Sequence, residues 1–148
     1  MNAPVDPDVV ARACAELMWA EDKASQGLGI SLDAVAPGRA TLSMTVADHM
    51  TNGHGTCHGG YIFALADSAF AFACNTYDER TVAGHCSVSF LKPGLRGDRL
   101  VADAVERARE GRSGIYDVRV SRADGEVIAE FRGHSRTIGG SFLKKAAV

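Results

Sequence analysis

The spacing of hydrophobic residues changes along the chain, and each change predicts a different element. Between Pro7 and Gly27, apolar residues recur on one side of a helix. Two strand-like runs follow, residues 30–35 and residues 40–46, and the turn-forming sequence Ala36-Pro37-Gly38 separates them. The N-terminal part of the chain therefore predicts a helix followed by a β-hairpin.

The most apolar stretch, Tyr61 to Cys74, follows His58-Gly59-Gly60 and predicts one long helix from His58 to about Tyr77. Its faces are apolar except at Asp67 and Ser68. Burying an ionised carboxylate without partners costs several kcal/mol or more. Asp67 therefore needs a reason, which is either a buried structural partner or a chemical role.

The rest of the chain predicts an antiparallel sheet. Residues 82–90 alternate as a half-buried strand, and short glycine-containing turns separate the strands after it. Those later strands are residues 99–109, 114–122 and 126–138. Consecutive hairpins imply an α+β class, in which the apolar helix lies against the sheet and is wrapped by it or covered by another chain. No linker or repeat divides residues 1–148, so a single domain is expected.

Composition excludes several classes of function. The 148 residues are 46% hydrophobic and 23% charged, with a formal net charge of −2. No basic cluster suits nucleic acid. The N-terminus lacks a secretory signal, and no apolar run reaches the roughly 20 residues that cross a bilayer, so a soluble cytoplasmic protein is expected. The four cysteines lack CxxC spacing, which favours reduced thiols.

The start of the apolar helix offers a second chemical group. Amides of a first helical turn suit a developing oxyanion, and glycine lets a carbonyl approach them. Gly59 and Asp67 are eight residues apart, about 12 Å along a helix axis. One small carbonyl cannot contact both groups of one helix. A shared site therefore requires two antiparallel helices, as in a two-fold dimer.

Several short sequences together resemble the hot-dog fold acyl-CoA thioesterases of the phenylacetate degradation pathway, and the resemblance covers nearly the whole chain. The sequences that carry it are Asn52-Gly53-His54-Gly55-Thr56-Cys57-His58-Gly59-Gly60, Leu65-Ala66-Asp67-Ser68-Ala69, Asn75, Phe90-Leu91-Lys92-Pro93-Gly94, Gly97-Asp98, Gly114-Ile115-Tyr116-Asp117 and Phe131-Arg132-Gly133.

The resemblance implies an antiparallel sheet curled around one long central helix, an additional N-terminal helix, and a tetramer built from two dimers. It implies that Asp67 is the catalytic nucleophile or general base and that the Gly59 amide polarises the thioester carbonyl. Asn52 and His58 match polar residues around the thioester, and Ser68 stands where relatives often carry threonine. Hydrolysis of an aryl-acetyl-CoA needs no metal or organic cofactor, since coenzyme A is part of the substrate.

Other interpretations of single residues stay open. His49, His54, Cys57 and His58 invite a zinc site, although they lack well-spaced ligand pairs. Cys57 beside a histidine is a conceivable nucleophile, but a core thiol is favoured. His134 could approach a ligand. The aromatic residues of the helix are expected in the core or interface, and some of them could line an acyl pocket: Tyr61, Phe63, Phe70 and Phe72. Cations that could hold coenzyme A phosphates are Lys92, Arg96, Arg107, Arg109, Arg132 and Arg136.

Two rival functions remain. A hot-dog hydratase or dehydratase usually shows an Asp and a His about five residues apart on the helix, and Phe72 occupies the position five residues after Asp67. A non-catalytic acyl-CoA-binding module would keep the pocket and lose the carboxylate, so the presence of Asp67 argues against it. An acyl-CoA thioesterase is the preferred interpretation.

Overall fold

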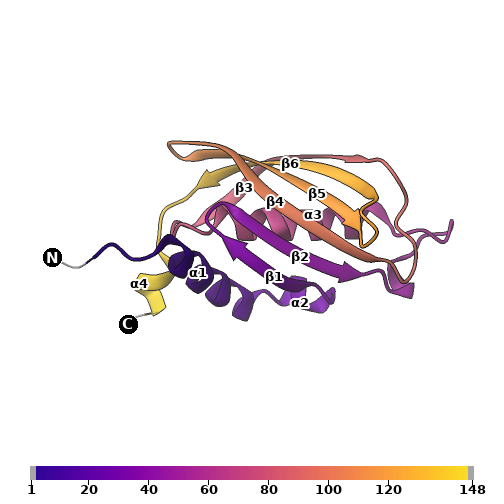
Figure 1. The fold of residues 1–148 in the computed structure, drawn as a ribbon, viewed down its shortest axis with the longest axis horizontal. Coiled ribbons are helices and arrows are strands. Elements are labelled where there is room, and N and C mark those ends of the chain that lie inside the picture. The colour runs from indigo at the N-terminus through magenta and orange to yellow at the C-terminus, as the bar shows by residue number, and fades with distance from the viewer. Residues whose placement is uncertain (1–2, 147–148) are drawn as a thin grey trace.

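The computed structural model describes residues 3–146 and shows one curved six-stranded antiparallel sheet (Figure 1). The order across the sheet is β1-β2-β4-β5-β6-β3. The α+β class and the predicted hairpins are confirmed. The strands are β1 (Ser31–Ala36), β2 (Arg39–Thr45), β3 (Thr81–Phe90), β4 (Arg99–Glu110), β5 (Ser113–Arg122) and β6 (Val127–Thr137).

The apolar helix α3 (Gly59–Cys74) lies along the concave side of the sheet and supplies much of the core. Its Phe70 ring packs between Tyr116 and Phe131, with ring centroids 5.6 and 5.9 Å away. Gly133 makes this approach possible, because a Cβ there would lie 2.8 Å from the Phe70 ring. The prediction of one central helix against the sheet is confirmed.

The end predicted for this helix, near Tyr77, is wrong. The helix ends at Cys74. Beyond it, the Asn75 side chain donates to the carbonyls of Ala71 and Thr81 and accepts from the Thr81 amide, at 2.9 to 3.0 Å. An asparagine that bonds to backbone groups in this way offers an alternative to continued helix and directs the chain toward β3.

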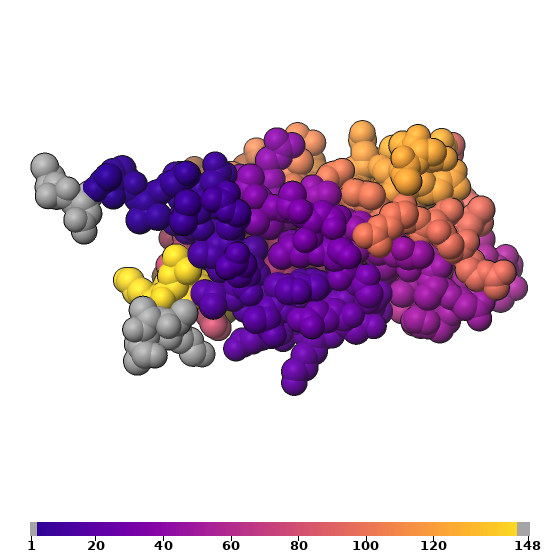
Figure 2. All heavy atoms as spheres, turned by 60° about the horizontal axis from the view of Figure 1, so that its bottom comes forward, coloured from indigo at the N-terminus to yellow at the C-terminus, as the bar shows by residue number. Residues whose placement is uncertain are grey.

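The N-terminal segment forms two helices where one was predicted, α1 (Pro7–Glu21) and α2 (Lys23–Gly27). The break falls at Asp22, whose carboxylate accepts from the Ser25 amide at 2.9 Å and so caps α2. Both helices run beside β1 in Figure 1, and their indigo and violet atoms form much of the face turned forward in Figure 2. Trp19 of α1 packs on Phe72 of α3 at 6.1 Å.

Strand β3 departs most from its prediction as a half-buried strand. Among the described strands it pairs only with β6, and it forms one edge of the sheet. Only Cys86 and Val88 pack against the core, while Val82 and Phe90 are 45% and 51% exposed. A register shift between Ala83 and His85 breaks the alternation. Alternation alone does not distinguish a central strand from an edge strand.

All four cysteines are free, as predicted. Among the described residues, no helix is long and apolar enough to cross a membrane.

Candidate functional site

Asp67 lies half-buried in the middle of α3, on the side that faces β3. Within residues 3–146, its carboxylate has no hydrogen-bond donor and no cation within ion-pair distance. Burial raises the pKa of this carboxyl above its ordinary value of 3.8. The thiols of Cys74 and Cys86 are close enough that the charge of Asp67 adds to the effect of burial in raising their pKa, that of Cys74 to about 12. Asp67 is therefore a desolvated base among protonated thiols.

The first turn of α3 presents a free backbone amide. His58 is the N-cap, and its Nδ1 accepts from the Gly60 amide at 2.9 Å. The Tyr61 amide donates to the His58 carbonyl at 3.0 Å. The Gly59 amide, which precedes these two in sequence, has no acceptor among the described residues. It is available, at the positive end of the helix dipole, for an oxygen that develops negative charge.

His58 thus lies at the start of α3, as the sequence predicted, but its ring caps the helix. Because Nδ1 accepts from Gly60, the ring hydrogen of neutral His58 must sit on Nε2. His58 fixes the turn that exposes the Gly59 amide, and the structure gives no evidence that it takes part in proton transfer.

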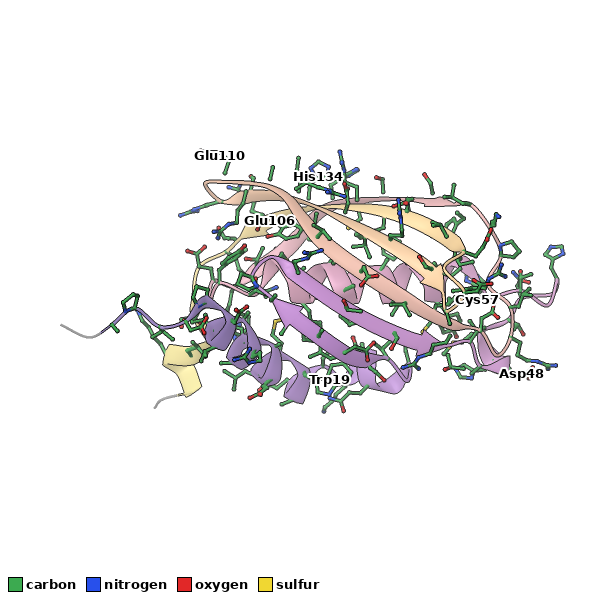
Figure 3. The ribbon with its side chains drawn as sticks, viewed as in Figure 1. Trp19, Asp48, Cys57, Glu106, Glu110 and His134 are labelled. Atoms are coloured by element: carbon green, nitrogen blue, oxygen red, sulfur yellow. The ribbon has the colours of Figure 1, made fainter. Side chains whose placement is uncertain are left out.

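Asn52 holds the loop that leads into α3. Its Oδ1 accepts from the His54 amide at 2.9 Å and from the amide and hydroxyl of Thr56 at 3.3 and 3.2 Å. The side-chain NH₂ has no acceptor among the described residues and is free to donate to a ligand. The loop lies at the same end of the molecule as the start of α3, where Cys57 and Asp48 are labelled in Figure 3.

Ser68 does not bond to Asp67. Its hydroxyl lies 2.9 Å from the hydroxyl of Ser25 on α2. Adjacent positions on a helix point about 100° apart, so Ser68 lies toward α2 and Asp67 toward β3, and both side chains stay partly exposed between buried Ala66 and Ala69. The sequence contains the two residues side by side, but only the fold shows that another serine binds this hydroxyl.

Two of the four helix aromatics lie in the core, as was expected first from the sequence. Phe70 and Phe72 are 1% exposed and lie inside the core, so they cannot line an open site. Sequence reasoning missed Phe90 at the end of β3. Its half-exposed ring packs on Gly59, since a Cβ there would lie 3.0 Å from the Phe90 Cζ. Its occurrence in the Phe90-Leu91-Lys92-Pro93-Gly94 sequence was the only available signal.

The alternative sites gain no support. No group of three potential metal ligands occurs in the described part of the chain. Cys57 is buried, which raises the pKa of its thiol and disfavours the reactive thiolate. His134 stacks edge-on with His85 at 5.5 Å. It follows inward-facing Gly133 on β6 and so points to the outer face of the sheet, away from α3.

Most of the cations named as candidate phosphate ligands already have acidic partners. Arg132 and Arg107 both bind Asp117 at 2.7 to 2.9 Å, and Arg96 binds Asp48 at 3.0 Å. Lys92 pairs with Glu126, and Arg109 lies 3.6 Å from Glu106. Arg136, on β6, is exposed and is the one candidate without an acidic partner among the described residues.

The chain matches the Thioesterase superfamily over residues 54–129, which contain Gly59 and Asp67. It is 41% identical to the acyl-coenzyme A thioesterase PaaI of Escherichia coli K12 over 132 residues, which are 89% of this chain and 94% of that protein. The structure of PaaI, from the phenylacetic acid degradation operon of E. coli, superposes with a TM-score of 0.90 at 40% identity and covers 92% of this chain and 99% of that one.

A second solved structure, a mutant of the phenylacetic acid degradation protein PaaI of Thermus thermophilus, is 37% identical with a TM-score of 0.76. It covers 79% of this chain and 100% of its own. The sheet wrapped around α3 is thus the hot-dog fold, and the chain belongs to the thioesterase superfamily.

Proposed function

We propose that this protein hydrolyses acyl-CoA thioesters, with Asp67 of one subunit and the Gly59 amide of another acting on the same carbonyl. The observation that carries the proposal is the carboxylate of Asp67, which has no partner within residues 3–146. It lies half-buried on an apolar helix whose first turn presents an amide without an acceptor among the same residues. A carboxylate that stabilises the fold would be expected to accept from protein donors, as Glu106 does from Tyr116 and Tyr77. The superfamily match and the similarity to an acyl-CoA thioesterase support the same activity.

The groups fit either of two balanced reactions. As a general base, Asp67 takes a proton from water while the water oxygen attacks the thioester carbon. As a nucleophile, its carboxylate oxygen attacks that carbon and forms an anhydride, which water then hydrolyses. In both, the Gly59 amide stabilises the oxyanion and the carbon–sulfur bond breaks. The sulfur of coenzyme A then gains a proton, from Asp67 in the first reaction and from solvent water in the second, and coenzyme A leaves as a thiol.

The distance between the two groups supports a shared site. Along one α3 the Gly59 amide and the Asp67 carboxylate are about 12 Å apart, so one thioester carbonyl cannot contact both groups of the same subunit. Edge strand β3 lies beside Asp67 and offers ten residues without proline, with Val82 and Phe90 exposed. An open edge of this kind is suited to pairing with a second copy. We infer a two-fold dimer with antiparallel α3 helices, and two dimers can then form a tetramer.

The acyl group is inferred to be aryl-acetyl, as in phenylacetyl-CoA or a hydroxylated or ring-opened relative. Phe90 supports this, because an exposed aromatic face beside the Gly59 amide suits a flat ring. The names of the E. coli and T. thermophilus relatives refer to phenylacetic acid degradation. The proposed reaction needs no metal or organic cofactor.

A thiol-release assay across acyl-CoAs tests this function. We expect phenylacetyl-CoA to be hydrolysed faster than palmitoyl-CoA. Faster turnover of the long chain would refute the aryl preference, and no turnover of any thioester would refute the thioesterase. Sedimentation at micromolar concentration should show no folded monomer, and an active monomer would refute the shared site.

A further inference from the structure

The Ser68 hydroxyl is the last member of a hydrogen-bonded chain that begins outside α3. Asp22, at the start of α2, accepts from the Ser25 amide through Oδ1 at 2.9 Å and from the Ser25 hydroxyl through Oδ2 at 2.6 Å. The Ser25 hydroxyl then lies 2.9 Å from that of Ser68. Ser25 is only 2% exposed, so water competes little for these bonds.

The order of the partners fixes the direction of each bond. A hydroxyl has one hydrogen, and an ionised carboxylate can only accept. Ser25 therefore donates its hydrogen to Asp22, and the bond between the two serines must use the hydrogen of Ser68. Ser68 Oγ keeps free lone pairs but has no hydrogen left for Asp67 or for a ligand.

We propose that Asp22 and Ser25 are positioning residues that hold Ser68 as a hydrogen-bond acceptor beside Asp67. The acceptor would bind an N–H or O–H donor of the reaction. Two donors have this chemistry, the hydrolytic water and an amide N–H of the pantetheine arm of coenzyme A. The role of Ser68 rests on the proposed function, because it requires that the reaction take place next to Asp67.

Asp22→Asn reverses the direction of the hydrogen bonds from Asp22 through Ser25 to Ser68 and keeps nearly the same side-chain shape. The Ser25 amide holds the carbonyl oxygen of the new side chain at the Oδ1 position, so its NH₂ group must face the Ser25 hydroxyl. The introduced NH₂ group then donates to Ser25, and Ser25 donates to Ser68. Ser68 then no longer donates to Ser25, and its hydroxyl hydrogen can point toward Asp67. There it would face the N–H or O–H donor that the Ser68 oxygen is proposed to accept from. The α2 cap is retained, since asparagine caps helices about as well as aspartate.

We expect Asp22→Asn to melt within about 2 °C of the wild type and to lose about fivefold or more in kcat/KM, the effect of one hydrogen bond. A fall in kcat at constant KM would assign the donor to water. A rise in KM at constant kcat would assign it to pantetheine. Unchanged kcat and KM would overturn the proposal. If Asp22→Asn does not fold, Ser25→Ala takes its place, with the same two readouts and the same overturning result.

Two controls separate this effect from general damage. Asp6→Asn makes the same change at the N-cap of α1, where Asp6 accepts from the Asp8 amide at 2.9 Å, and should leave both constants unchanged. In a Ser68→Ala background, Asp22→Asn should have no further effect. An equal loss in both backgrounds would show that Asp22 does not act through Ser68 and would overturn the proposal.

Asp67→Asn distinguishes this proposal from the proposed function. If that variant is inactive while Asp22→Asn is fully active, the positioning role fails and the thioesterase assignment stands. If Asp67→Asn keeps its turnover, the proposed function itself fails.

Discussion

Two carboxylates on the core side of the sheet, Asp67 in the middle of α3 and Glu106 near the far end of that helix, have opposite surroundings. Glu106 accepts from the hydroxyls of Tyr116 at 2.8 Å and Tyr77 at 3.0 Å, and Arg109 lies 3.6 Å away. Asp67 has no such partner among the described residues, and burial raises its pKa. Figure 3 shows Glu106 pointing inward from β4.

The difference shows that a carboxylate that stabilises this fold has hydrogen-bond donors and a cation around it. The cluster around Glu106 satisfies Tyr116, which is 1% exposed, and Arg109 lies over the Tyr77 ring at 3.6 Å. Removing such a partner leaves buried hydroxyls unsatisfied. Asp67 bonds to no other group that the structure describes, so its charge adds no hydrogen bond or ion pair to this part of the fold. A costly charge without a structural task indicates a chemical one.

The largest expected effect is on turnover when Asp67 is changed. Asp67→Asn is nearly isosteric and should assemble and bind acyl-CoA, while thiol release falls by about 100-fold or more because the base or nucleophile is lost. Rates per folded molecule with phenylacetyl-CoA measure this. Near-wild-type turnover would place Asp67 with Glu106 as a structural residue.

Glu106 should behave in the opposite way. Glu106→Ala removes the acceptor for Tyr116 and Tyr77 and should lower the free energy of unfolding by about 1–3 kcal/mol, with turnover per folded molecule unchanged. Glu106→Gln keeps an acceptor oxygen and should lose less. Urea unfolding with parallel thiol-release assays measures both quantities. A hundredfold loss of turnover in folded Glu106→Gln would contradict the contrast.

The pH dependence of stability sharpens the comparison. Because the folded-state pKa of Asp67 is raised, the folded protein holds this proton more tightly than the unfolded chain. The stability that protonation of Asp67 provides is present below pH 3.8 and is lost as the pH rises through the folded pKa. Asp67→Asn should therefore be more stable than the wild type at neutral pH. Thermal melts of both proteins should converge toward pH 3.8; a variant less stable at neutral pH would contradict this.

A smaller effect is expected at the start of α3. In Gly59→Ala the new Cβ would lie 3.0 Å from the Cζ of Phe90, a side chain that is 51% exposed, so a small shift of the ring accommodates it. The variant should fold. Its kcat/KM should fall by about 10-fold, because the added methyl group hinders the approach of the substrate carbonyl to the residue 59 amide and weakens the hydrogen bond to the oxyanion. Phe90→Leu added to Gly59→Ala should relieve the close contact with the new methyl group but should not restore kcat/KM. Recovery of the full rate would show that the ring, and not access to the amide, limits turnover.

The sequence by itself determined the α+β class, the central helix and the residues of interest. The run from Tyr61 to Cys74 is too apolar to be anything but core or interface, and one carboxylate in it stands out because burying charge is costly. Glycine-containing turns such as Asp124-Gly125 fixed the later hairpins, since few residues adopt the required backbone angles. These features depend on local geometry and on burial.

Only the tertiary structure decided how distant segments meet. The position of β3 at the sheet edge, next to β6, follows from a long-range pairing that alternation cannot reveal. The contact of Phe90 with Gly59 joins residues 31 positions apart in sequence, and the bond between Ser25 and Ser68 joins residues 43 positions apart. The partners of Glu106 and the isolation of Asp67 likewise depend on which side chains the fold brings within hydrogen-bond distance. A residue's type states which bonds it can make, whereas packing decides which of them it does make.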